Sequence, residues 1–155
     1  MGRINHILSL GVLLAGVVSL VVGAVFIYQA YDKESWMQNA MRQEKVTLGL
    51  TDEQIAAGEF IDTAAEAQAA GDTIREHRRS IASSYQELLG GGQFDPSDPE
   101  QLSYAQALNM ENYLYLAVLG FGVTTVIYGV GAFMLVVGAA LVGGGIVLFR
   151  LSSEV

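Results

Sequence analysis

Residues Gly120 to Gly145 read GFGVTTVIYGVGAFMLVVGAALVGGG, which places eight glycines and no charged residue in 26 positions. In water, each glycine in a helix interior costs about 1 kcal/mol relative to alanine. Inside a membrane, helices associate through close van der Waals contact, and small side chains let their backbones approach. The stretch therefore predicts a membrane-spanning helix against which other helices pack.

Two uncharged segments are each long enough to cross a bilayer. No Asp, Glu, Lys or Arg occurs from Ile4 to Tyr31, nor over the 37 residues from Tyr113 to Phe149. About 20 apolar residues suffice for one span, whereas a soluble fold would leave this apolar surface uncovered. The first segment is longer than the apolar core of a signal peptide and lacks a clean cleavage site, so we expect a retained signal anchor.

Charge predicts the orientation of the chain. Arg3 and the amino terminus flank the first span, Arg150 follows the second, and 15 acidic and 6 basic residues lie between the spans. Because positively charged flanks stay in the cytoplasm, we expect both termini inside a bacterial plasma membrane and the acidic loop outside. The predicted fold is an all-α membrane protein, a two-span transmembrane helical hairpin with a small acidic helical extracytoplasmic domain between the spans. Its parts are a first transmembrane helix at 1–31, an extracytoplasmic helical domain at 32–112, a second transmembrane helix at 113–149 and a cytoplasmic tail at 150–155.

Local signals divide the segment between the spans. The first helix is expected to continue past the span and to end near Lys45, before a short β-like stretch at Val46–Leu50. Thr51 and Thr63 are each followed three residues later by Gln or Glu, the spacing of a capping box. The second of these boxes predicts a long helix that ends at Leu89.

The last helix is predicted to start at Pro99, with Asp98 as its N-cap, and to run into the second span. Over the 37 uncharged residues a straight helix would be about 55 Å long, against a hydrocarbon core of about 30 Å. Either residues 113–125 project outward and are covered by the acidic domain or a partner, or Gly143–Gly145 breaks the helix.

Small residues form a stripe on each predicted span. They recur every four residues on the first span and at steps of three and four on the second, where only Val136 interrupts them. The two stripes either pack on each other within one hairpin or leave some glycines to a different protein. The candidate helix-packing residues are Gly11, Ala15, Ser19, Gly23, Gly122, Thr125, Gly129, Ala132, Ala139 and Gly143. Off this stripe, the second span also carries Gly120, Gly131, Gly138 and Gly145.

Candidate chemistry is sparse. The chain has no cysteine and two histidines, His6 and His77, which the predicted topology places on opposite sides of the membrane. His77 is the one candidate metal ligand, but no metal-binding spacing surrounds it, and we expect it to pack beside Ile74 and Ile81. No phosphate loop, nucleophile elbow or dinucleotide motif occurs, so we expect no catalytic residue and no cofactor. An acidic exterior also argues against nucleic acid as a partner.

Three groups of residues, taken in order, resemble an uncharacterised family of two-span membrane proteins common in Actinobacteria. The resemblance covers most of the chain from Glu44 to Gly138. Members of that family often carry the label aromatic ring-opening dioxygenase, which this chain does not fit, because such an iron site needs two histidines and a carboxylate on one face. The groups are Ala67-Gln68-Ala69 with Asp72, Ile74 and His77, then Tyr85-Gln86-Glu87-Leu88, then Phe121-Gly122-Val123 with Gly129 and Gly131.

These observations lead to three hypotheses of function. The first is a non-catalytic accessory subunit of a plasma-membrane complex, with other integral membrane subunits and the lipid bilayer as partners and a membrane oxidoreductase or monooxygenase as one expected host. The second is a self-assembling homo-oligomer that forms a scaffold or a small pore. The third is a metal-binding outer domain that uses His77.

Overall fold

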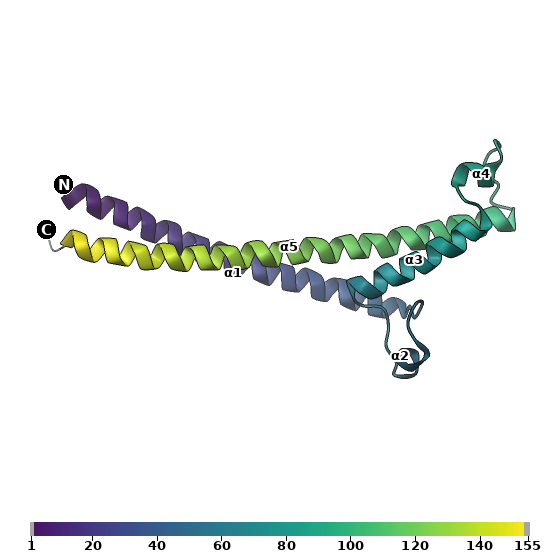
Figure 1. Cartoon of the computed structure of the whole chain (residues 1–155), viewed down its shortest axis with the longest axis horizontal. Coiled ribbons are helices and arrows are strands. Elements are labelled where there is room, and N and C mark those ends of the chain that lie inside the picture. Colours follow the sequence, from purple (N-terminus) through teal and green to yellow (C-terminus); the bar gives the residue numbers. More distant parts are fainter. Residues whose placement is uncertain (1, 154–155) are drawn as a thin grey trace. The chain divides into compact units, whose positions relative to one another are not determined.

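The computed structural model describes residues 2–153, with side chains from His6 onward, and all of its regular elements are helices (Figure 1). The chain divides into two compact units. Unit 1 comprises the residues up to Lys33 and those from Val123, and unit 2 comprises Glu34–Gly122. The helices are α1 (Gly2–Glu44), α2 (Asp52–Ala56), α3 (Ala64–Ile81), α4 (Tyr85–Leu89) and α5 (Pro99–Ser153).

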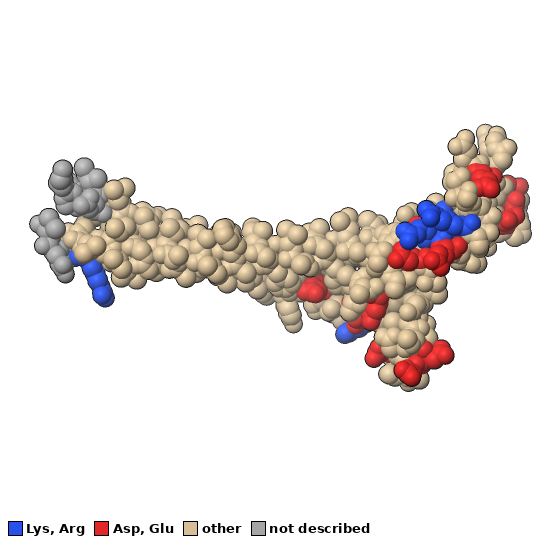
Figure 2. All heavy atoms as spheres, viewed as in Figure 1, with Lys and Arg blue, Asp and Glu red and all other residues tan. Residues whose placement is uncertain are grey.

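Helices α1 and α5 are long and apolar enough to cross a membrane. In the most apolar 18-residue window of each, only 11% of the residues are buried. A core helix of a soluble protein would hide most of such a window, so the apolar surface of these two helices requires cover from lipid or from protein. On the visible face of unit 1 almost all side chains are uncharged, whereas acidic and basic side chains gather on unit 2 (Figure 2).

In unit 1, α1 and α5 lie side by side in opposite directions. Gly23 near the middle of α1 approaches Gly131, Gly16 approaches Gly138, and Leu13 approaches Gly145. From one contact to the next, the residue number decreases on α1 and increases on α5. The two helices are therefore antiparallel. At the ends of the pair, His6 stacks on Phe149 with 4.9 Å between ring centroids.

Unit 2 has a small apolar core. Ile61, Ala67, Ala70 and Leu114 are buried in it. The backbone N–H of Ile61 donates to the carbonyl of Val46 over 2.9 Å, which ties the segment before α3 to the segment after α1. Partly buried side chains complete the core, namely Met41, Val46, Leu48, Leu50, Ile74, Ala117 and Val118.

The predicted helix starts are confirmed. Thr51 and Thr63 both form complete capping boxes at the starts of α2 and α3. Asp98 accepts a hydrogen bond from the backbone N–H of Glu100 over 2.9 Å at the start of α5. The end of α1 near Lys45 is also confirmed, since α1 stops at Glu44 and Lys45 takes a left-handed conformation with φ of 51°.

Two expectations for the middle segment are wrong. The predicted helix from Thr63 to Leu89 is two helices, because Ala82 is extended and Ser84 caps a new helix, α4. Residues 46–50 form no strand within the described chain. Their alternate apolar side chains instead point into the core of unit 2, so the β-like pattern reflects burial rather than sheet pairing.

The long apolar run stays helical throughout. Helix α5 is continuous to Ser153, so Gly143–Gly145 does not break it. At the start of the run, Leu114 and Phe121 are buried within unit 2, with exposed fractions of 8% and 5%. Ile61, Ala67 and Ala70 of the acidic segment share a core with Leu114, while Leu119 on another side is exposed. That residues 113–125 project outward from the membrane stays a prediction.

Candidate helix-packing interface

On α1, the contact with α5 follows a repeat of seven residues. The buried positions of α1 in unit 1 are all small and lie seven apart. On an ideal α-helix, residues seven apart differ in direction by only about 20° around the helix axis, so such residues stay on nearly the same face over several turns. These residues are Ser9, Gly16, Gly23 and Ala30.

On α5, the same period recurs in what we name the contact face, made of Thr124, Gly131, Gly138 and Gly145, all of them buried. A methyl group built on Gly138 would lie 2.9 Å from the carbonyl oxygen of Gly16. One built on Gly131 would lie 2.9 Å from the carbonyl oxygen of Gly23. The two backbones touch directly at these points, which is the use of glycine expected between helices in lipid.

A hydrogen bond joins the two helices between the glycine contacts. The Ser19 hydroxyl donates to the backbone carbonyl of Met134 over 2.8 Å. Of the residues predicted on the first span, Ser19 and Gly23 thus lie against α5. Ala15 is exposed, and nothing lies within 4 Å of a methyl group built on Gly11.

The stripe predicted on the second span lies on the side of α5 away from the contact face, about 100–160° around the helix from it. Nothing lies within 4 Å of a methyl group built on Gly122, Gly129 or Gly143. Thr125 is exposed on the same side. The interpretation that the two stripes pack on each other is therefore wrong for α5, although contact of this stripe with another helix stays a prediction. We name as the open face the exposed residues Gly122, Gly129, Ala132, Ala139 and Gly143.

The glycines off the predicted stripe are the ones that contact α1. Gly131, Gly138 and Gly145 approach α1 within unit 1, and within unit 2 a methyl group on Gly120 would lie 2.6 Å from the sulfur of Met37. One sequence signal separates the two sets. The spacing of seven through Thr124 continues without a gap to Gly145, whereas the predicted stripe is interrupted by a valine.

In unit 2, a buried ion pair links α3 to α5. Arg78 Nε donates to Glu111 Oε2 over 2.7 Å, and Arg78 also donates to the hydroxyl of Tyr104. The hydrogen bond with Glu111 raises the pKa of Arg78. On the same helix, Arg75 pairs with a carboxylate three residues away, Asp72, over 2.7 Å. Arg78 pairs instead with a residue 33 positions away.

A second polar contact joins the same two helices. The Tyr115 hydroxyl donates to Asp72 Oδ1 over 2.7 Å, and a hydrogen bond from Gln68 reaches the same carboxylate over 3.1 Å. These donors lower the pKa of Asp72, with the bond from Tyr115 as the larger cause. The Tyr115 ring lies over Gly71, where an added methyl group would be 2.9 Å from the ring. Glycine at this position lets the ring reach α3.

His77 is exposed on α3 rather than packed between Ile74 and Ile81. Within the described residues, no group of three His, Asp and Glu side chains lies close enough together to hold a metal ion. The core-facing side of α3 consists of Ala67, Ala70, Gly71 and Arg78, and His77 lies beside this side of the helix. The structure therefore offers no support for a metal site at His77.

Comparison of the chain with known protein families, curated proteins and solved structures found no match. The resemblance to the actinobacterial two-span family stays a prediction. Function is therefore argued from the geometry of the two units alone.

Proposed function

We propose that the chain is a non-catalytic accessory subunit of a multi-subunit complex in a bacterial plasma membrane. In this proposal α1 and α5 form a transmembrane hairpin, and the open face of α5 packs against a membrane-spanning helix of a different subunit. The observation that carries the proposal is that α5 has small residues on two separate faces, of which α1 covers only the contact face.

The apolar surface of unit 1 supports the membrane location. Large apolar side chains are exposed along both helices, among them Leu14 at 66%, Val126 at 65% and Phe133 at 67%. Water would make this exposure costly at about 25 cal/mol for each Å² of apolar surface, whereas lipid does not. The aromatic residues Tyr31 and Trp36, 65% and 67% exposed, lie where the uncharged run of α1 ends and suit a membrane interface.

The open face supports a helix as the partner. Inside a membrane, moving a glycine-rich helix face from lipid to protein gains nothing from the burial of apolar area. A second helix backbone can, however, approach such a face closely, and the two helices then gain dispersion contacts. Gly122, Gly129 and Gly143 leave space for such an approach, since a methyl group at each would meet nothing within 4 Å. Gly129 and Gly143 follow each other along the part of α5 that lies in unit 1, which is helical without interruption.

In the proposed topology, both termini are cytoplasmic and the acidic unit 2 lies outside. Its buried ion pair and small core hold α3 against α5. Unit 2 would then brace the outward surface of the partner subunits. Chemistry by this chain is not part of the proposal, because the site geometry favours packing over catalysis.

Purification in mild detergent followed by native mass spectrometry tests the proposal. Wild-type chain should be recovered with different proteins at a fixed ratio. The variant Gly129→Leu fills the open face and should lose these proteins, whereas Val130→Leu, on an exposed position about 100° around the helix and off this face, should retain them.

Two other results would count against this assignment. Recovery of the chain alone as a discrete oligomer, dispersed by Gly129→Leu, would identify a second copy as the occupant of the open face. Recovery of a monomer from native membranes after crosslinking would leave the open face in contact with lipid and overturn the proposed role.

A further inference from the structure

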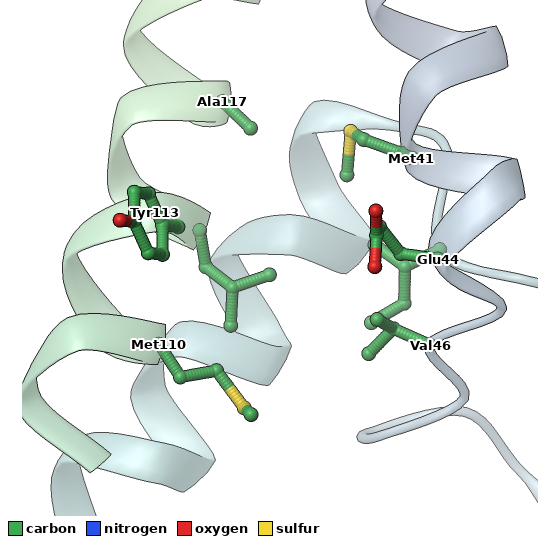
Figure 3. A pocket seen from close by; sticks show the side chains of 8 residues that line it. Met41, Glu44, Val46, Met110, Tyr113 and Ala117 are labelled. Carbon is green, nitrogen blue, oxygen red and sulfur yellow. The ribbon is translucent and has the colours of Figure 1, made fainter. Parts of the chain in front are cut away.

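An apolar pocket lies within unit 2, with a volume of about 470 Å³. Figure 3 shows its two walls, with Met110, Tyr113 and Ala117 of α5 on one side and Met41 and Glu44 of α1 on the other. Val46 extends the α1 wall. The pocket is independent of the open face of α5 and of any partner that binds there.

The floor of the pocket belongs to the core of unit 2. Ile61 and Leu114 line it, with exposed fractions of 1% and 8%. Both residues are held by core contacts with Ala67 and Ala70, so the floor is formed by the packed core and not by a loose surface. At the rim, Tyr113 is 72% exposed.

The size and lining fit an elongated apolar ligand. Small-molecule sites commonly measure about 300–1,000 Å³ and combine an apolar lining with few polar groups. A methionine stands on each wall, Met41 and Met110, and the unbranched thioether side chain adapts to ligands of irregular shape. Both walls are parts of helices that are long and apolar enough to cross a membrane.

Charge selects the head group of the ligand. Glu44 is the one charged side chain among the residues that line the pocket, and it is exposed at the rim. Over positions 32–112 there are 15 acidic and 6 basic residues. Of the two basic neighbours of Glu44, Arg42 and Lys45, the first is paired with Asp62. The net negative field of this segment disfavours an anionic head and attracts a cationic one.

The geometry points to a binding site for a single-chain amphiphile with an alkyl tail and an amine head that carries no phosphate. The tail lies over Ile61 and Leu114 between the two methionines, and the ammonium group pairs with the Glu44 carboxylate at the rim. The source of such a ligand is either an aminolipid or a free alkylamine, which share this chemistry. The inference uses the membrane location but not the proposed partner contact.

Methyl NMR of the five methionines gives a direct test. The full chain, labelled with ¹³C-methyl methionine in nanodiscs of zwitterionic lipid, is titrated with dodecylamine, dodecanol or dodecanoate. We expect dodecylamine to shift the Met41 and Met110 signals and to leave Met134 of unit 1 unchanged. Dodecanol should bind more weakly and dodecanoate weakest. Equal shifts at Met134 would indicate general partition into the bilayer and overturn the site.

Three variants sharpen the result. Ala117→Phe fills the pocket and should abolish the shifts, whereas Leu116→Phe, on an exposed neighbour outside the pocket, should preserve them. Glu44→Gln should weaken the binding affinity for dodecylamine about twofold to fivefold, the range for an exposed ion pair. It should leave the affinity for dodecanol unchanged. Unchanged dodecylamine affinity in Glu44→Gln, or unchanged shifts in a folded Ala117→Phe variant, would overturn the assignment.

The source of the ligand is separated by a second titration. Nanodiscs that contain sphinganine, a lipid with one alkyl chain and an amine head, should shift the same two methionine signals if an aminolipid is the ligand, and should leave them unchanged if only a free alkylamine fits. Loss of binding in Ala117→Phe with intact co-purification of other subunits would show that the pocket and the open face act separately.

Discussion

The contacts that stabilise unit 1 internally differ in kind from those that stabilise unit 2. Unit 1 joins two helices through glycines that bring backbones into contact, and one of its interhelical hydrogen bonds comes from a neutral serine. Unit 2 joins its helices through a buried ion pair and a few apolar side chains. In lipid, close approach of backbones is the available attraction, whereas near water an apolar core supplies it.

The same difference explains where small residues are required. At Gly138 the partner backbone fills the space of a side chain, while at Gly129 that space is empty. At Gly71 the neighbour is the edge of the Tyr115 ring, which can shift. Substitutions should therefore have graded effects that depend on what each residue faces, rather than on the residue type.

The largest effect is expected in unit 2 from Glu111→Ala. This change leaves the Arg78 guanidinium buried without its carboxylate, and breaking a buried ion pair in this way costs about 3–5 kcal/mol. Hydrogen exchange of the α3 backbone in the full chain should measure the loss as faster exchange of unit 2, with unit 1 unchanged. The double variant Arg78→Met with Glu111→Leu removes both charges and should be less destabilised. Equal exchange in Glu111→Ala and wild type would show that the pair does not hold unit 2.

A smaller effect is expected in unit 1 from Gly138→Leu. The new side chain would meet the Gly16 carbonyl and the Leu20 side chain, and overpacking of this kind costs about 1–3 kcal/mol. Leu8 and Leu151 line one small pocket in unit 1. Spin labels on cysteines at these two positions should report a distance distribution with a larger mean and a greater width. The chain has no native cysteine to interfere.

Gly143→Leu is the matched control for this measurement. It introduces the same side chain into the same helix, where a methyl group meets nothing within 4 Å. The spin-label distance in purified monomer should equal that of the wild type. A change as large as that in Gly138→Leu would mean that the two faces of α5 have been assigned the wrong way round.

Features that depend on neighbours along the chain could be predicted from the sequence. The capping boxes at Thr51 and Thr63 each lie within four residues, and the long apolar helices follow from composition alone. The break before α4 was missed, because apolar spacing continued through Ile81 while Ser84 supplied a competing N-cap. Here the capping hydrogen bond of a local serine determines where the helix breaks, although the apolar periodicity continues.

Features that depend on distant residues could not be predicted. Both faces of α5 carry small residues at seven-residue spacing, and only the interruption at Val136 distinguishes the open face from the contact face. That difference by itself does not identify the helix that each face meets. The predicted stripe on α1, Gly11 to Gly23, uses a spacing of four residues, and each such step moves the position by about 40° around the helix and so away from α5. Residues spaced by seven stay close to the contact with α5. The pairing of Arg78 with Glu111 spans 33 positions and is fixed by core packing of α3 on α5.

A modest effect is expected from Ser19→Ala in unit 1. It removes the hydrogen bond to the Met134 carbonyl and keeps a small side chain at the contact. Interhelical hydrogen bonds in membrane proteins average about 0.6 kcal/mol, so the spin-label distance should broaden slightly and keep its mean. Ala15→Ser, on an exposed position one turn away, is the control and should leave the distribution unchanged. A separation as wide as in Gly138→Leu would make the hydroxyl, not the glycines, the main link between the helices.

The smallest effect is a dependence of unit 2 on pH through Asp72. Hydrogen bonds from Tyr115 and Gln68 lower its pKa below the ordinary 3.8, so the folded state prefers the carboxylate. The contribution of Asp72 to stability is therefore present above pH 3.8 and is lost as the pH falls through the lower folded pKa. Asp72→Asn and Tyr115→Phe should both be slightly less stable than wild type at pH 6 by hydrogen exchange of α3. For both variants the difference should shrink as the pH is lowered below 3.8, because wild-type Asp72 then becomes protonated. A difference that is constant with pH would mean that these bonds act by shape and not through the charge of Asp72.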